Sequence, residues 1–389
     1  MAPVYMDHNA TTPVDPRVLD AMLPYFTERF GNPSSPYELA AVTRAAVDES
    51  RKAVAGGLGA APESIVFTSG GTESDNMAIK GVLFSRGLEG SHVVSSVIEH
   101  HAVLRTLEYL RDRFGVAVTF VPADTEGRID PDAVAEAIRP ETALVTIMHA
   151  NNESGIIQPL SEISAIAKER GVLVHTDAVQ SVGKIPVLVD ELGVDLLSMS
   201  AHKLYGPKGV GALYVRPGTQ LDPLSQGGGH EGGMRPGTEN TAGIVGLAKA
   251  LTIANDHIAA EEARLCALCD SLIEGVLERV PDVLVNGSRR HRIPGTVNLA
   301  FRHVEGESIV LSLDMEGFAV STGSACTTDS AEPSHVLSAM GVSPRDAQGS
   351  VRFGLGRSTT ADDVERLLDV LPGIVERLRA MSPTVGRTP

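Results

Sequence analysis

The sequence predicts an α/β protein: a large domain with a mostly parallel seven-stranded sheet covered by helices, plus a smaller α+β domain. The chain has 389 residues, which is too long for a single hydrophobic core. Its composition, 42% hydrophobic and 21% charged, is typical of a globular protein. Between about residues 60 and 215, short apolar runs alternate with amphipathic segments, which favours parallel strands with helices on both faces.

Seven apolar runs in this region are expected to be strands. They cover residues 64–70, 92–97, 116–123, 142–150, 172–178, 195–201 and 211–216. Segments with helical periodicity lie between them, for example residues 72–85 and 160–171. We expect the large domain to span residues 15–258.

The C-terminal part predicts a different arrangement. Residues 240–281 have the pattern of one long helix, long enough to bridge two domains. Strands are expected at residues 283–287, 296–302, 318–323 and 350–356, and helices at 305–316, 332–340 and 360–380. Residues 1–14 and 259–389 are therefore expected to form the small domain. Cys266 and Cys269 lie on the long helix without further ligands at metal-binding spacing, so we expect them to serve packing.

Charge and composition exclude several classes of function. The formal net charge of −16 disfavours direct binding to nucleic-acid backbones, which need cationic partners. No apolar run approaches the ~20 residues that span a bilayer. The N-terminus does not resemble a secretion signal, and three cysteines favour a reducing, cytoplasmic location.

One lysine has a setting that suggests chemistry. Lys203, in "SMSAHKLYGPKG", follows an apolar run and is one of seven lysines in the chain. Asp177 ends another apolar run, 26 residues earlier. Open α/β sheets bind ligands at this edge, and pyridoxal 5'-phosphate needs both a lysine and a carboxylate for its pyridine nitrogen. The alternative is a helix-capping aspartate and a structural lysine.

A glycine-rich turn could hold the phosphate of such a cofactor. In "FTSGGTES", the backbone N–H groups of Ser69, Gly70, Gly71 and Thr72 would lie at the start of a helix, where anions bind. Ser200 and His202 flank Lys203 and offer further donors. The alternative is an ordinary turn in which Thr72 and Asp75 cap the helix.

Three more residues could complete a small-molecule site. Cys326 lies among small and polar residues, so we expect a reachable nucleophile on a mobile loop whose residues 327–332 are poorly ordered. Arg352 could clamp a carboxylate, and His100 could stack on a cofactor ring and move protons. The alternatives are an unremarkable loop cysteine, a surface arginine and a structural histidine.

These motifs together resemble those of the cysteine desulfurases, pyridoxal-phosphate enzymes of fold type I. The resemblance covers about residues 5–375. Within the family, the cysteine segment resembles the class with an extended, mobile cysteine loop. The stretches that carry it are "YMDHNATTP", "FGNPSS", "FTSGGTESDN", "EHHAV", "HANNESGIIQP", "HTDAVQSVGKIP", "SAHKLYGPKGVGALYV", "RPGTENT", "STGSACTT", "EPSHVL" and "VRFGLGR".

The resemblance implies a role for each matching residue. Lys203 would form the Schiff base, Cys326 would take the sulfur of L-cysteine as a persulfide, and His100 would stack on the ring and deprotonate the incoming thiol. Asn152 and Arg352 would hold the substrate carboxylate. The implied cofactor ligands are Gly71, Thr72, Asp177, Gln180, Ser200, His202, Lys203 and Thr238.

The resemblance also implies partners and leaves alternatives. Thr238 would reach the phosphate of a neighbouring subunit, so a homodimer is expected, together with a sulfur-acceptor protein such as an iron–sulfur scaffold. No metal is expected. A selenocysteine lyase, another fold type I lyase or aminotransferase, or a silent scaffold remain alternatives. Tyr37, Gly232 and Gly354 depart from the common family pattern.

Overall fold

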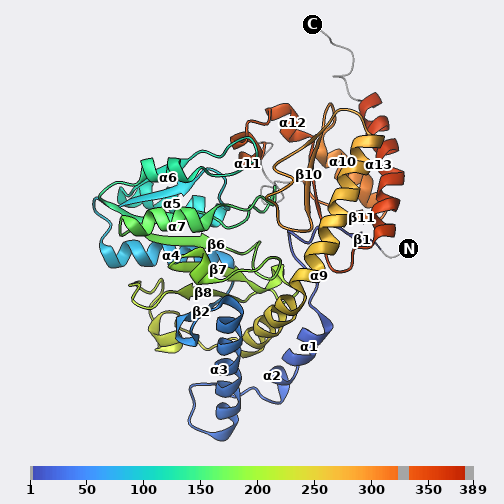
Figure 1. Ribbon diagram of the computed structural model, residues 1–389. Coiled ribbons are helices and arrows are strands. Elements are labelled where there is room, and N and C mark those ends of the chain that lie inside the picture. Colours follow the sequence, from blue (N-terminus) through green and yellow to red (C-terminus); the bar gives the residue numbers. More distant parts are fainter. Residues whose placement is uncertain (1–2, 323–332, 382–389) are drawn as a thin grey trace.

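The computed structural model describes residues 3–322 and 333–381 and shows two lobes joined by a long helix (Figure 1). The larger lobe contains a seven-stranded sheet, as predicted, with strand order β2-β8-β7-β6-β5-β3-β4. Only β8 pairs antiparallel with its neighbours, so the sheet is mostly parallel. The strands are β2 (Ile65–Thr68), β3 (His92–Ser96), β4 (Ala117–Val121), β5 (Thr142–Thr146), β6 (Leu173–Asp177), β7 (Leu196–Ser200) and β8 (Gly211–Val215).

Helices cover both faces of this sheet because its strands are apolar on both sides. Val93 of β3 faces one hydrophobic cluster and Val94 faces another, following the two-residue repeat of a strand. Helices α4 and α5 contribute to the first cluster, and α3, α6, α7 and the long helix α9 (Thr241–Arg279) contribute to the second. The helices before α9 are α1 (Pro16–Met22), α2 (Pro24–Thr27), α3 (Glu38–Leu58), α4 (Gly71–Arg86), α5 (His101–Phe114), α6 (Pro131–Ala137), α7 (Leu160–Glu169) and α8 (Val189–Leu192).

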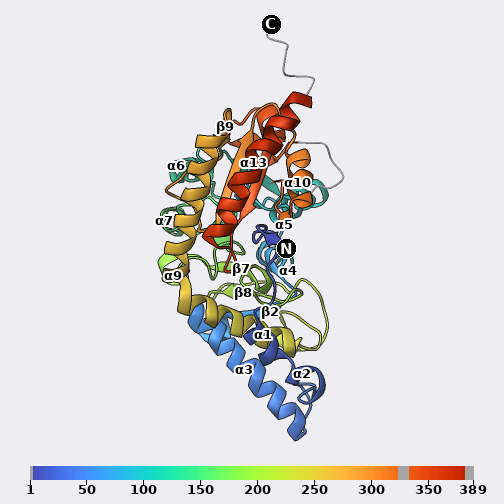
Figure 2. The ribbon, with the colours of Figure 1, turned by 90° about the vertical axis from the view of Figure 1, so that its right-hand side faces the viewer.

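Helix α9 (Thr241–Arg279) runs along the molecule and connects the two lobes (Figure 2). It begins where the side chain of Asn240 accepts a hydrogen bond from the N–H of Gly243. One part of α9 packs on α3 and another on α13 (Ala361–Met381), which confirms the long bridging helix. Cys269 is buried in the small-lobe core, but Cys266 is exposed, so the packing prediction was wrong for Cys266.

The smaller lobe has its own sheet and hydrophobic core. Strands β9 (Val283–Val285), β10 (Thr296–Phe301) and β12 (Ser350–Gly354) form an antiparallel sheet in the order β12-β10-β9. A short parallel pair joins β1 (Val4–Tyr5) to β11 (Phe318–Ala319). Helices α10 (Gly306–Met315) and α13 (Ala361–Met381) cover this core.

Two short helices of the C-terminal part pack elsewhere. These are α11 (His335–Ala339) and α12 (Pro344–Gln348), and only α11 was predicted. Their residues Val336, Leu337 and Ala347 belong to the core of the large lobe, not to that of the small one. Among the described residues, every helix is too short or too polar to cross a membrane.

Candidate active site

Asp177 and Lys203 lie at the ends of two adjacent parallel strands. Asp177 is the last residue of β6 and pairs in register with Ser198 of β7. The 3-10 turn η2 (Ala201–Lys203) follows β7 directly and ends at Lys203. The Nζ atom of Lys203 donates hydrogen bonds to the carbonyl oxygens of Asn9 at 2.7 Å and Ala10 at 2.6 Å. The N-terminal segment therefore lies against this edge of the sheet.

Burial and neighbouring groups shift the pKa values of Asp177 and His100. Burial raises the pKa of Asp177, while His100, the N–H of Val179 at 2.9 Å from Oδ1 and Lys203 favour its charged form. Burial lowers the pKa of His100 below its ordinary value, which favours the neutral ring. Its Nδ1 accepts a hydrogen bond from the N–H of Ala102 at 3.1 Å, which leaves the ring proton on Nε2.

The glycine-rich turn forms an open helix start. Gly70, with φ of 151°, precedes α4, and no side chain caps this end. The predicted alternative, capping by Thr72 and Asp75, is therefore wrong; Asp75 is buried within the lobe. A Cβ on Gly71 would lie 2.6 Å from Cγ2 of Val179, so only glycine allows this close approach. One expected donor is occupied, because the N–H of Ser69 donates to Glu73.

Further donors surround this helix start. A Cβ on Gly70 would lie 3.7 Å from Oγ of Ser200, so Ser200 faces the turn. His202 lies 3.1 Å, Nδ1 to Oγ1, from Thr11, and burial lowers its pKa to about 4. Thr72 is exposed on the first turn of α4. An open helix N-terminus, a buried carboxylate and a strand-end lysine fit a pyridine cofactor that carries a phosphate.

Gln180 connects the lysine to a residue that the sequence analysis missed. Its Nε2 donates to the carbonyl oxygen of Asn9 at 3.0 Å, the same oxygen that Lys203 contacts. Its Oε1 accepts a hydrogen bond from Nζ of Lys184 at 2.9 Å. This residue is Lys184. It could have been identified from the sequence, because it is one of only seven lysines and lies four residues after Gln180.

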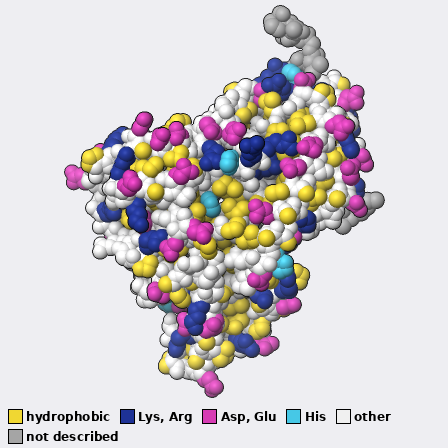
Figure 3. All heavy atoms as spheres, viewed as in Figure 1, with side chains coloured by type: hydrophobic (Ala, Val, Ile, Leu, Met, Phe, Trp, Pro, Cys, Tyr) yellow, Lys and Arg dark blue, Asp and Glu magenta, His cyan; other side chains and the backbone are white. Residues whose placement is uncertain are grey.

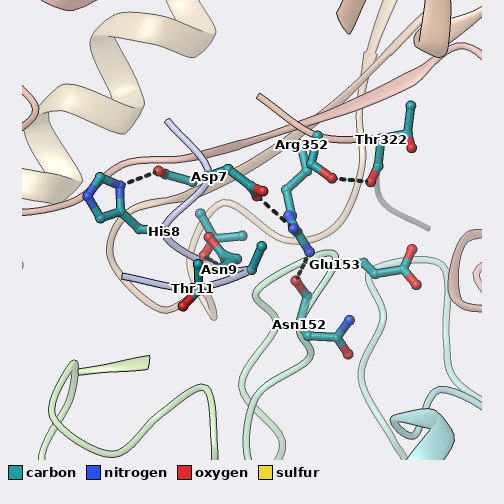
Figure 4. Close-up of polar contacts among 12 residues, drawn as sticks. Asp7, His8, Asn9, Thr11, Asn152, Glu153, Thr322 and Arg352 are labelled. Atoms are coloured by element: carbon teal, nitrogen blue, oxygen red, sulfur yellow. Dashed lines mark hydrogen bonds and ion pairs between the residues drawn. The ribbon is translucent and has the colours of Figure 1, made fainter. Parts of the chain in front are cut away.

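Arg352 is buried in β12, so the alternative of a surface arginine is wrong. Its guanidinium lies between the carboxylate of Asp7, at 2.8 Å, and the backbone carbonyl of Asn152, at 2.9 Å (Figure 4). Its Nε is buried and has no hydrogen-bond partner among the described residues. The guanidinium thus keeps donor capacity that an anionic group could use, and Asp7 is a partner that sequence reasoning missed.

Behind Asp177 lie two more buried carboxyl groups. Glu99 accepts hydrogen bonds at Oε1 from Oγ of Ser96 at 2.5 Å and from the N–H of Met148 at 3.0 Å. Burial raises the pKa of Glu99 to about 8 and that of Asp75 well above its usual range. Since like charges cannot all be ionised here, Asp177 is the member whose charge Lys203 supports.

Two predicted residues are not joined to this cluster. Thr238 is exposed, and no hydrogen bond between described residues links it to Lys203 or Asp177. Cys326 and residues 327–332 lie outside the described residues. Ligand atoms of Asp75, His100 and Asp177 lie within 4.8 Å of one another.

The three departures from the family pattern have distinct settings. A Cβ on Gly354 would lie 2.6 Å from Oδ1 of Asn9 and 2.8 Å from the backbone nitrogen of His8, so glycine is required there. Gly232 has a φ of 64°, which also favours glycine. Tyr37 is 52% exposed at the start of α3.

Comparisons with known proteins identify the family of this chain. The Aminotransferase class-V family matches residues 4–367. The chain is 53% identical to the cysteine desulfurase IscS of Dictyoglomus turgidum, over 98% of this chain and 96% of the relative. It is 51% identical to the cysteine desulfurase IscS of Methanosarcina thermophila, over 98% and 94% of the two chains.

Solved structures show the same fold. A NifS-like protein superposes with a TM-score of 0.91 at 37% identity, covering 97% of this chain and 100% of its own. SspA in complex with cysteine gives a TM-score of 0.80 at 39% identity, covering 90% and 98%. The chain therefore belongs to the cysteine desulfurases of the Aminotransferase class-V family, which depend on pyridoxal 5'-phosphate.

Proposed function

We propose that this protein converts L-cysteine to L-alanine and takes the sulfur onto Cys326. The carbon–sulfur bond of the substrate breaks and a sulfur–sulfur bond forms, so one substrate cysteine and one Cys326 thiol give alanine and one Cys326 persulfide. The observation that carries the proposal is the juxtaposition of Lys203 with Asp177 at the sheet edge, next to Asn9 and Ala10. One relative, SspA, was solved in complex with cysteine, which supports the same substrate here.

The residues of the site would hold the cofactor in a defined way. Lys203 would bind its aldehyde carbon, Asp177 its pyridine nitrogen and Gln180 its phenolic oxygen. Its phosphate would lie at the start of α4, with Gly71, Thr72, Ser200 and His202 as ligands. The cofactor supplies an electron sink for the bond-breaking steps. Lys203, once displaced by the substrate amine, would take the proton from the substrate Cα.

His100 would act as a proton donor rather than as the base that the sequence analysis favoured. Its Nδ1 already accepts from Ala102, so the neutral ring presents an N–H at Nε2. Taking a proton at Nδ1 would break the cap of α5. Burial lowers the pKa of His100 and so favours this neutral, donating ring.

Arg352 and Asn152 would bind the substrate carboxylate. The buried, unpartnered Nε of Arg352 supports this role. Asp7 would stay beside the guanidinium, so that the arginine retains a charge partner when the site holds no substrate.

The protein would work as a cytoplasmic homodimer that passes sulfur to an acceptor protein. Large apolar side chains are exposed along residues 19–42, which supports a protein interface there. These residues are Leu19, Leu23, Phe26, Phe30, Tyr37 and Val42. Thr238 would complete the phosphate site of the neighbouring subunit. Acidic and basic side chains are interspersed on the face in Figure 3.

The Lys203→Ala variant tests this assignment. We expect the purified parent protein to be yellow and the variant to lose that absorbance while it stays folded, because the covalent attachment is gone. Absorption spectra, circular dichroism and mass spectrometry after borohydride treatment measure this. A covalent, borohydride-fixed cofactor in Lys203→Ala would show that another residue binds it.

A further inference from the structure

Lys184 is a second, partly buried lysine beside the active site. It follows β6 by seven residues, and it is one of seven lysines in the chain. Burial, together with the charges of Lys203 and Arg352, lowers its pKa to about 7. Among residues 3–322 and 333–381, no carboxylate lies within ion-pair distance of it. Placing a cation there without a counter-ion costs free energy, which points to a role for Lys184 other than an ion pair.

A chain of hydrogen bonds joins the two lysines. Nζ of Lys184 donates to Oε1 of Gln180 at 2.9 Å, and Nε2 of Gln180 donates to the carbonyl oxygen of Asn9 at 3.0 Å. The same carbonyl oxygen accepts from Nζ of Lys203 at 2.7 Å. Gln180 is 4% exposed and Asn9 is 2% exposed, so water does not compete for these contacts.

These contacts fix the amide of Gln180 in one orientation. In its charged form Lys184 can only donate, so it requires an oxygen opposite it. A carbonyl group can only accept, so Asn9 requires the amide nitrogen. Both neighbours therefore select the same amide rotamer. Without Lys184, the buried Oε1 would lose its donor.

The two lysines also line a single cavity, which brings their charges together. Tyr205, Arg357 and Glu261 line the same cavity, and Glu261 is its acidic side chain. Since two positive charges in one partly buried space repel, each favours the neutral form of the other. The ionisable groups that face Lys184 are His8, His202, Lys203, Tyr205, Glu261, Arg352 and Arg357.

We propose that Lys184 is a positioning residue that fixes the Gln180 amide and places a second positive charge beside Lys203. The inference rests on the proposed function, because Lys203 matters here as the cofactor-binding lysine. It assigns Lys184 no contact with the substrate. Its effect on the reaction passes through Gln180 and through the electrostatics at Lys203.

The charge is tested on the cofactor-loaded protein by recording its visible absorption from about pH 6 to about pH 10. Lys184→Met and Lys184→Gln should move the midpoint of the absorbance change upward by about half a pH unit or more, because a repelling cation is gone. Lys184→Arg stays charged throughout this range and should leave the midpoint at or below the parental value, and the matched control Lys208→Met, at an exposed lysine, should keep the parental midpoint. An unshifted midpoint in both neutral variants, or an equal shift in Lys208→Met, would overturn the electrostatic role.

The hydrogen bond is tested with a double-mutant cycle on cofactor affinity. Lys184→Met should weaken cofactor binding several-fold in the parent, but add nothing in a Gln180→Leu background, because it acts through that amide. Equal weakening in both backgrounds would overturn the positioning role. The result stays separate from the proposed function: Lys203→Ala that keeps its covalent cofactor refutes the assignment of Lys203, whatever Lys184 does.

Discussion

At the scale of single residues, the site is shaped by ionisable groups that burial keeps neutral. Burial raises the pKa of Glu99 to about 8 and that of Glu153 to about 7, and it lowers that of His149 to about 4. Glu99 and His149 therefore stay neutral near pH 7 and avoid the cost of an uncompensated buried charge, while Glu153 becomes neutral below about pH 7. Asp177 differs because the charge of Lys203 and the hydrogen bond from the N–H of Val179 favour its ionised form.

Glu99 makes stability depend on pH, and its replacement tests this. Its folded-state pKa of about 8 lies above its ordinary value of 4.5, so the folded state binds the proton more tightly. The contribution of Glu99 is therefore complete below about pH 4.5 and is lost as the pH rises towards 8. Glu99→Gln cannot ionise, so its Tm should fall less between pH 5 and pH 8 than that of the parent, by about 2–4 °C.

Thermal melting of both proteins at the two pH values measures this difference. The control is Glu136→Gln on α6, where the side chain is exposed and has no hydrogen-bond partner among the described residues. Its pH dependence should match that of the parent. If Glu99→Gln also matched the parent, the Glu99 carboxyl would not be neutral in the folded protein.

At the scale of elements, the segment that follows β1 forms one wall of the site. The carbonyl oxygens of Asn9 and Ala10 accept from Lys203, and Asp7 pairs with Arg352. Gly354 at the end of β12 holds this segment: its N–H donates to Met6, and its carbonyl accepts from the N–H of His8 at 3.0 Å. The irregular segment after β1 is therefore held in place by hydrogen bonds to the end of strand β12.

Gly354→Ser should disturb the site through this contact. The new Cβ would lie 2.6 Å from Oδ1 of Asn9 and 2.8 Å from the backbone nitrogen of His8, so the wall must move. We expect a loss of about 1–3 kcal/mol in the free energy of unfolding, together with weaker cofactor binding. Gly373→Ala on α13 is the matched control, because nothing lies within 4 Å of its added Cβ. Parental stability and affinity in Gly354→Ser would show that the wall adapts freely.

At the scale of the whole molecule, the site draws on both lobes. Arg352 comes from the sheet of the small lobe, while Asp177 and Lys203 come from that of the large one. The backbone carbonyl of Asn152, which follows β5, accepts from Arg352 and joins the two. Helix α9 contributes residues to both cores, so the lobes are connected by packing as well as by the chain.

The proposed homodimer predicts the effect of a charge on the exposed apolar region. Phe30 is 64% exposed, and Phe30→Asp should dissociate the dimer because a buried aspartate would lack a partner. Sedimentation velocity measures the change. Leu311 on α10 has a similar exposure of 60%, and Leu311→Asp should leave the association unchanged. A dimeric Phe30→Asp would place the interface elsewhere.

The sequence by itself determined the seven strands, the long bridging helix, and the positions of Lys203 and Asp177 at strand ends. These features follow from local periodicity, which depends on neighbours a few residues apart. The sequence also identified the family, because the family's motifs occur in the same order along nearly the whole chain. The predicted boundary near residue 258 stays a prediction.

Only the tertiary structure decided which side chains meet. Asp7 and Arg352 are 345 residues apart, and Asn9 meets Gln180 across 171 residues, so no local pattern relates them. In the sequence, little distinguishes Lys184 from other lysines that follow a strand. The structure places it against Gln180, without a carboxylate partner among the described residues. The tautomer of His100 was decided in the same way, by the N–H of Ala102 at the start of α5. Burial and long-range contact, which set pKa values and hydrogen-bond partners, exist only in the folded chain.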